Sequence, residues 1–246
     1  MLDSKREVIN QLKKEILLLE GFKPSLQRIN KSFGLGPIEN AFPNHIFPQG
    51  VIHEFIIDSP EQSAASTGFV SALLKTLMNN TGICIWISNG RKPFPPAIKV
   101  FGVEPDRIIF IDLHRDKEAL WTTEEALKYD GLAAVVTDIK EITFTQSRRL
   151  QLAIEDSKVT GIILRNGCEK LNPTACTARW RISPLPSLPE ADMPGIGYPR
   201  WSVELLKVRN GVTGSWQVEW YENRFHIIDK AAAAYQEGFH QTLNTG

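Results

Sequence analysis

The sequence predicts an α/β protein with a doubly wound, mostly parallel sheet, helices on both faces of that sheet and an antiparallel hairpin near the C-terminus. Between residues 50 and 167, short apolar segments alternate with helical segments, which is the pattern of strands joined by crossovers. The segment GICIWIS, 82–88, is almost entirely apolar, as a parallel strand buried on both faces is. After residue 175, polar and apolar residues alternate singly, which favours antiparallel strands.

Five strand segments and four helices account for the parallel part of the sheet. The expected strands are 51–57, 82–88, 107–112, 131–139 and 159–167. The expected helices are 66–77, 96–103, 116–129 and 143–157. In the last helix, Thr143 and Gln146 have the spacing of a capping box, which marks its first turn.

The C-terminal strands are expected to join one edge of this sheet. In CTARWRIS, 176–183, the side chains of Arg179 and Arg181 share one face of the strand. A Pro-rich loop at 184–199 follows, and the segment 201–221 reads as a hairpin with Asn210-Gly211 in its turn.

The tryptophans of the hairpin are expected in two different settings. Trp216 and Trp220 lie on the same face of one strand, and the polar residues between them point to the other face. This alternation favours a place in the core. Trp201 stands beside the Pro-rich loop and is our candidate for an exposed aromatic contact.

Residues 4–20 read as an amphipathic helix that ends at Gly21. Its apolar stripe includes Leu12, Ile16 and Leu19, which pack on the core or dock on a partner. We divide the chain into an N-terminal helix and linker at 1–44, a core with the hairpin at 45–229, and a flexible tail at 230–246.

Composition narrows the class of protein. Of the 246 residues 42% are hydrophobic, which is enough for a full core, and 28 basic residues balance 28 acidic ones. That balance argues against a strongly basic nucleic-acid binder. The three cysteines have no CxxC spacing, so we expect neither a disulfide framework nor a structural metal site. With no span-length apolar run and no signal peptide, we expect a soluble cytoplasmic protein without membrane contact.

The segment VIHEFIIDSPEQSAASTGFVSALLKTL, 51–77, has the outline of a phosphate-binding unit: a strand, a small-residue loop and a helix. A working phosphate loop needs GxxxxGK[ST], whose lysine meets the phosphates. Here the loop has no lysine and a single late glycine, Gly68. Asp58 places a negative charge where polyphosphate would bind. Ser66 and Thr67 either mimic the magnesium ligand or cap the helix, and we favour the cap.

Asp138, at the end of GLAAVVTDI, stands where an ATPase carries a metal-binding acid. The alternative is a carboxylate that hydrogen-bonds groups at the strand end, which we favour. The loop after the second strand carries no acid to polarise a water molecule. Asp58, Ser66, Thr67, Gly68 and Asp138 therefore form at most a vestigial nucleotide site, with no catalytic residue and no cofactor expected.

The succession of segments resembles the ImuA family of bacterial error-prone repair proteins, relatives of the RecA recombinase core. The resemblance covers roughly 45–228 and is most specific in SRRLQLAIEDS, GIILRN and WSVELLKVRNG…SWQVEW. It implies a RecA-like fold and a role in damage-induced mutagenesis. It also implies partners: a Y-family polymerase relative (ImuB-like), an error-prone C-family polymerase that reaches DNA with the sliding clamp, and RecA itself, so that contact with DNA is indirect.

The resemblance suggests where contacts lie. An N-terminal helix docks on the neighbouring protomer in RecA-like filaments, which matches 4–20. Lys207 and Arg209 match basic residues that face a neighbour's nucleotide, and we interpret them as partner or phosphate contacts. The loop 166–175 matches the second DNA-binding loop. The other candidate contacts are Arg148, Arg149, Arg179, Arg181 and Trp201.

Four functions remain open from the sequence. The first is a non-catalytic scaffold of a translesion polymerase complex, found near the nucleoid during repair, and we favour it. The second is a direct DNA-binding repair protein, whose basic patch would combine the six candidate cations. The third is a residual nucleotide-binding enzyme. The fourth is a RecA-like inhibitor of cell division, which the extra arm and hairpin disfavour.

Overall fold

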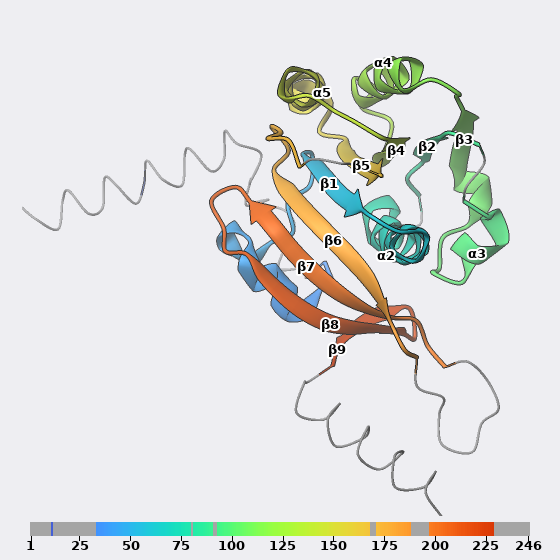
Figure 1. The fold of residues 1–246 in the computed structure, drawn as a ribbon, viewed down its shortest axis with the longest axis vertical. Coiled ribbons are helices and arrows are strands. Elements are labelled where there is room, and N and C mark those ends of the chain that lie inside the picture. The colour runs from blue at the N-terminus through green and yellow to red at the C-terminus, as the bar shows by residue number, and fades with distance from the viewer. Residues whose placement is uncertain are drawn as a thin grey trace, which may run out of the picture.

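The structure is a computed structural model that describes residues 11, 33–79, 81–90, 93–167, 171–187 and 197–228. These residues form a nine-stranded sheet in the order β3-β2-β4-β5-β1-β6-β7-β8-β9 (Figure 1). The strands are β1 Ile52–Ile57, β2 Cys84–Ser88, β3 Ile108–Asp112, β4 Ala134–Ile139, β5 Thr160–Asn166, β6 Ala178–Leu185, β7 Arg200–Val208, β8 Gly214–Tyr221 and β9 Arg224–Ile227.

Four α-helices and three short 3₁₀ helices are described. They are α2 Pro60–Met78, α3 Pro95–Lys99, α4 Asp116–Leu127, α5 Phe144–Ser157, η1 Gly36–Ala41, η2 Pro43–His45 and η3 Pro105–Arg107. The capping box of α5 is present: the Thr143 hydroxyl accepts from the backbone N–H of Gln146, and the Gln146 side chain accepts from the Thr143 N–H.

The sheet changes from parallel to antiparallel at β6. The strands β1 to β5 pair in parallel, and β6 lies parallel to β1 but antiparallel to β7. The strands β7 and β8 form an antiparallel hairpin, and Asn210 lies in the connection between them with a positive φ of 56°. These findings confirm the predicted fold class and hairpin; β9, which pairs antiparallel with β8, was not predicted.

Each face of the sheet carries its own core. One core contains α2, Ile98 of α3 and the apolar faces of β6, β7 and β8, whereas the other lies between the sheet and α4 and α5. On the α4/α5 side, β6, β7 and β8 present half-exposed polar side chains, among them Arg181, Ser202 and Gln217. That part of the sheet therefore has one polar face that no described helix covers (Figure 1).

Residues 33–47 belong to the first core, although the sequence suggested a linker there. Phe33, Phe42 and Phe47 are buried in it, and Phe47 stacks on the ring of His53 at 4.6 Å between centroids. Trp180 of β6 lies at the centre of this aromatic group and is fully buried. The described part of the linker thus covers the apolar face of the C-terminal strands.

The structure corrects the prediction for Trp201 and does not describe most of the two terminal segments. Trp201 is buried and not exposed, because strand alternation places it with Val203 and Leu205 on the face that α2 covers. Its ring meets that of Phe69 edge-on at 5.7 Å. The expected helix 4–20, apart from Gln11, and the tail 230–246 lie outside the described residues.

Within the described residues, no helix has both the length and the apolar character needed to cross a bilayer.

His53 makes the first core sensitive to pH. Its Nε2–H donates to the Pro48 carbonyl at 2.8 Å, and its Nδ1 accepts from Trp180 Nε1 at 3.3 Å, so the buried ring is neutral. Burial lowers the pKa of His53 to about 4. The unfolded chain binds this proton near pH 6.5 and the folded chain only near pH 4, so stability is lost as the pH falls through that window.

We therefore expect the free energy of unfolding to fall by roughly 3 kcal/mol between pH 6.5 and 4 because of this residue. Urea denaturation over that range would measure it. The variant His53→Gln should lose most of this pH dependence, whereas His114→Gln, at an exposed position, should keep it. Equal pH dependence in the two variants would contradict the assignment.

Candidate functional site

The turn between β1 and α2 is far shorter than a phosphate loop. β1 ends at Ile57 and α2 begins at Pro60, with Ser59 as its N-cap. The Ser59 hydroxyl accepts from the backbone N–H of Gln62 at 3.3 Å, and the Gln62 side chain accepts from the N–H of Asp58 at 2.9 Å. A Ser-Pro pair is a strong helix start, so the helix begins directly after the strand.

Ser66 and Thr67 consequently lie inside α2, and the expectation that they cap it is wrong. Ser66 is fully buried, and its Oγ has no hydrogen-bond partner among the described residues. The Thr67 carbonyl accepts from the Ser71 hydroxyl at 2.7 Å. Gly68 is a close-packing position: a Cβ there would lie 3.0 Å from Phe101 and 3.2 Å from Trp201.

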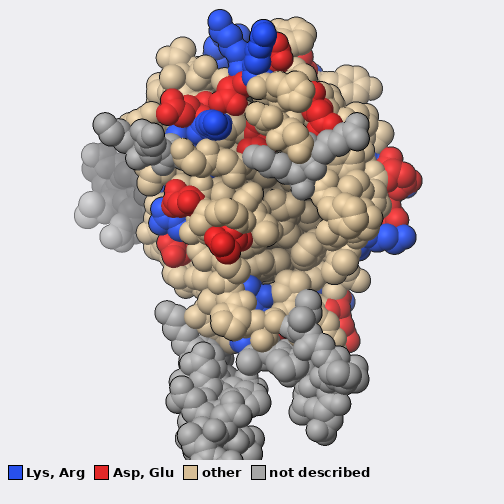
Figure 2. All heavy atoms as spheres, turned by 45° about the vertical axis from the view of Figure 1, so that its right-hand side comes forward, with Lys and Arg blue, Asp and Glu red and all other residues tan. Residues whose placement is uncertain are grey.

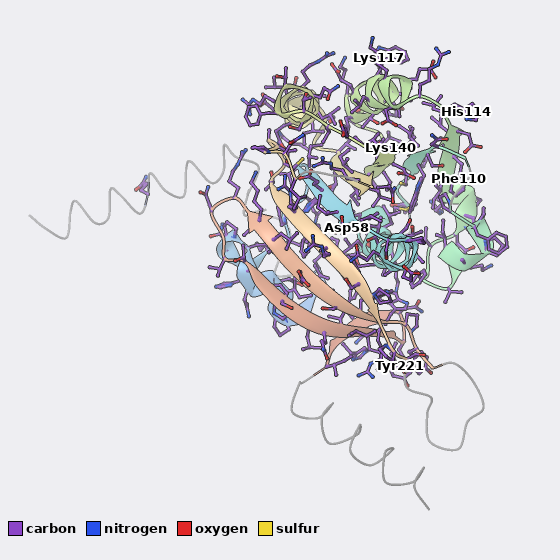
Figure 3. All side chains as sticks on the ribbon, in the orientation of Figure 1. Asp58, Phe110, His114, Lys117, Lys140 and Tyr221 are labelled. Atoms are coloured by element: carbon purple, nitrogen blue, oxygen red, sulfur yellow. The ribbon has the colours of Figure 1, made fainter. Side chains whose placement is uncertain are left out.

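The two acids of the vestigial site are held by other side chains. Asp138, at the end of β4, is buried and accepts a hydrogen bond from the Asn166 side chain on β5. Asp58 is exposed and pairs with Arg181 Nη2 at 3.2 Å, and Arg181 Nη1 lies 3.8 Å from Glu204. Figure 3 shows Asp58 at the junction of β1 and α2. Both carboxylates thus contribute to the fold.

A buried carboxylate that sequence reasoning missed lies at the centre of the sheet. Glu54 of β1 is fully buried and accepts from Arg165 Nη1 at 2.6 Å and from Arg179 Nε at 2.7 Å. The Thr174 hydroxyl donates to the same carboxylate at 2.8 Å. The signal was present: Glu54 and Arg165 interrupt otherwise apolar strands, and buried charges are usually paired.

Three of the candidate cations gather beside this carboxylate, at the loop 171–177. Arg179 Nη2 donates to the Asn172 carbonyl at 2.9 Å, and Lys207 Nζ donates to the Thr174 carbonyl at 2.7 Å. Arg209 Nη2 lies 3.5 Å from the Ala175 carbonyl. The cations therefore hold the loop through its backbone oxygens.

The remaining candidates are dispersed. Arg148 is exposed on α5, and Arg149 pairs with Glu124 of α4 at 2.7 Å. Leu12, Ile16 and Leu19 lie outside the described residues. The six cations do not share one patch: three meet at the loop 171–177, Arg181 pairs with Asp58, and the α5 pair is separate.

A comparison with models of known protein families finds no match. Among curated proteins, the chain is 34% identical over 197 residues to Protein ImuA of Caulobacter vibrioides, in strain NA1000 / CB15N and in strain ATCC 19089 / CIP 103742 / CB 15. The alignment covers 75% of this chain and 81% of each relative.

Among solved structures, the crystal structure of the RadB recombinase superposes with a TM-score of 0.54. It is 16% identical in sequence, and the match covers 80% of this chain and 99% of that one. This likeness concerns the fold alone, and it identifies the sheet as RecA-like.

The Glu54 cluster should be the most sensitive point of the fold to a single change of charge. Glu54→Gln leaves Arg165 and Arg179 buried without a carboxylate, and breaking a buried pair in this way costs about 3–5 kcal/mol. The midpoint of urea denaturation would measure the loss. The matched control is Glu124→Gln, whose partner Arg149 is largely exposed, and it should cost at most about 1 kcal/mol. Similar losses in both variants would show that the cluster has no special role.

Proposed function

Because the chain belongs to the ImuA family, we propose that it is a non-catalytic accessory subunit of a damage-inducible, error-prone DNA synthesis complex. In this proposal it acts through protein contacts on a RecA-like scaffold. Its partners are a Y-family polymerase relative (ImuB-like) and an error-prone C-family polymerase, with RecA as a further candidate. It works in the cytoplasm beside the nucleoid and reaches DNA chiefly through the polymerases.

The observation that carries the non-catalytic role is the direct start of α2 after β1. The residues where a phosphate loop would wrap around a nucleotide are helical from Pro60 onward. Glu61 lies in the first turn of this helix and Asp58 directly precedes its N-cap, so both carboxylates complement the positive end of the helix dipole and repel polyphosphate. Asn166 binds Asp138, and among the described residues we find no lysine at the turn between β1 and α2 that could meet a phosphate.

Contact through proteins is supported by an apolar surface at the edge strand β3, which we name the β3 edge surface. It comprises Phe94, Val100 and Ile109, which are 66%, 65% and 51% exposed. Because β3 is the last strand on its side of the sheet, no other described strand pairs with its outer edge. Figure 2 shows that the middle of this side of the molecule carries few charges. Exposed apolar side chains that lie together typically mark protein interfaces.

The N-terminal segment is the second contact in this proposal, through Leu12, Ile16 and Leu19. On α5, the exposed side chains of Phe144 and Leu152 lie four positions to either side of Arg148, so the three share one helical stripe. This stripe is the third contact.

A complementation assay separates contact from catalysis. In cells that lack the gene, we expect Thr67→Ala and Asp138→Asn to restore the damage-induced mutation frequency fully, because neither change touches a contact surface. Phe94→Asp/Val100→Asp should leave it near the level of the deletion, because a charge on the β3 edge surface is buried when a partner binds. Leu12→Asp/Ile16→Asp tests the N-terminal segment in the same way.

Pull-down from damage-treated cells provides the physical readout. The wild-type chain and Thr67→Ala should recover the Y-family polymerase relative, and the Phe94→Asp/Val100→Asp variant should not. Thermal unfolding of the purified variants controls for folding. Release of phosphate from ATP that Asp138→Asn abolishes, together with loss of mutagenesis, would overturn the proposal in favour of an enzyme.

A further inference from the structure

The antiparallel strands β6 and β7 contain a bulge that changes which way Lys207 faces. Trp180 pairs with Leu205 and Arg181 with Glu204, but the register shifts so that Arg179 pairs with Lys207 and Leu206 has no opposite residue. Bulges re-aim side chains and are frequent beside functional sites. The shift in register therefore changes the face of the sheet on which the charged side chains at the end of β7 lie.

Without the bulge, Lys207 would share a face with Trp201, Val203 and Leu205, which are buried in the first core. The extra residue moves Lys207 to the opposite face, beside Arg179, and Arg209 follows on that face two residues later. Val208 is moved the other way and packs against the first core. One inserted residue thus removes a cation from the core and places two cations on the polar face.

The positive charge gathered there exceeds the negative charge among the described residues. Four cations lie around the loop 171–177 and its carboxylate, namely Arg165, Arg179, Lys207 and Arg209, and no described ion pair joins Lys207 or Arg209 to an acid. Among the described residues, Glu54 is the carboxylate whose charge raises the pKa of Lys207. Burial, and then the charge of Arg179, lower the pKa of Lys207.

Lys207 and Arg209 also keep hydrogen-bond donors to spare. An ammonium group has three donors and a guanidinium group five. Lys207 uses one of its donors on the Thr174 carbonyl, and Arg209 makes one long contact with the Ala175 carbonyl. Both side chains are half-exposed, so a ligand can reach them from solvent. Backbone carbonyls satisfy hydrogen bonds but do not neutralise charge.

We propose that Lys207 and Arg209, supported by the fixed charge of Arg179, form a binding site for phosphate groups. Arg179 is held by Glu54 and adds a fixed positive charge beside the site, whereas Lys207 and Arg209 contact the ligand. A phosphate suits them because its oxygens accept charge-assisted hydrogen bonds from both. Both side chains are half-exposed at the end of β7, and we assign the phosphates of a single-stranded nucleic acid as their ligand. This inference does not rest on the accessory role.

Binding of a labelled oligothymidylate to the full chain, followed by fluorescence anisotropy at several salt concentrations, tests the site. Removal of two phosphate contacts in Lys207→Gln/Arg209→Gln should lower the log–log salt slope by about 1.4. That change corresponds to about 25-fold in affinity for each tenfold change in salt. The matched control is Arg115→Gln/Lys117→Gln, which removes the same charge from exposed positions at the start of α4 and should keep the wild-type slope.

Competition with inorganic pyrophosphate at matched ionic strength tests whether the site binds free phosphates as well as a nucleic-acid strand. Displacement of the oligothymidylate would show that the site also accepts free phosphates, and no displacement would restrict it to the strand. Equal losses in the two double variants, an unchanged slope in Lys207→Gln/Arg209→Gln, or salt-independent binding by the wild type would each overturn the proposal.

A single variant keeps the test decisive if the double variant fails to fold. Arg209→Gln removes only the longest of the three loop contacts and leaves the Lys207 hydrogen bond in place. It should lower the salt slope by about 0.7 with little change in thermal unfolding. Complementation of mutagenesis remains a separate measurement, so failure of the phosphate site would not be mistaken for failure of the accessory role.

Discussion

The carboxylate of Glu54 is the constraint on which the two halves of the sheet depend. It lies on β1 and is paired with Arg165 of β5 and Arg179 of β6, so it joins the parallel strands to the first C-terminal strand. A buried charge of this kind is tolerated only with its partners in place. Thr174 extends the same cluster to the loop 171–177, which brings the loop over β1. The position of β6, and therefore of the hairpin that follows, is tied to one charge network.

The turn after β1 differs from a phosphate loop. In a phosphate-binding protein the strand must be followed by a wide loop whose backbone N–H groups face the ligand. Here the Ser59-Pro60 pair starts the helix at once, and Asp58 pairs with Arg181. The strand, turn and helix have a structural role, because α2 covers the apolar faces of β1 and β6. The scaffold is thus retained for its shape, which suits a protein that works by contact.

Two surfaces on this scaffold differ in chemistry and are well separated in the order of the sheet. The β3 edge surface is apolar and ends the parallel side, whereas the phosphate site lies at β6 and β7, on the antiparallel side. An apolar surface favours a protein partner, and uncompensated cations favour an anionic one. A chain with zero net charge can therefore still concentrate positive charge locally, because Glu54 is the sole acid among the described residues at that cluster.

Local sequence patterns located most of the helices and strands of this protein, although not β9 or the short helices at 36–45. Apolar segments that alternate with helical ones, the Asn210-Gly211 turn and the cap at Thr143 are local patterns, and each depends only on neighbouring residues. Tertiary structure decided the strand order and the environment of single side chains. Ser66 is inside a helix because a stronger cap lies upstream, and Trp201 is buried because α2 covers its face. Lys207 faces solvent because of a bulge, which exists only through pairing with a strand elsewhere in the chain.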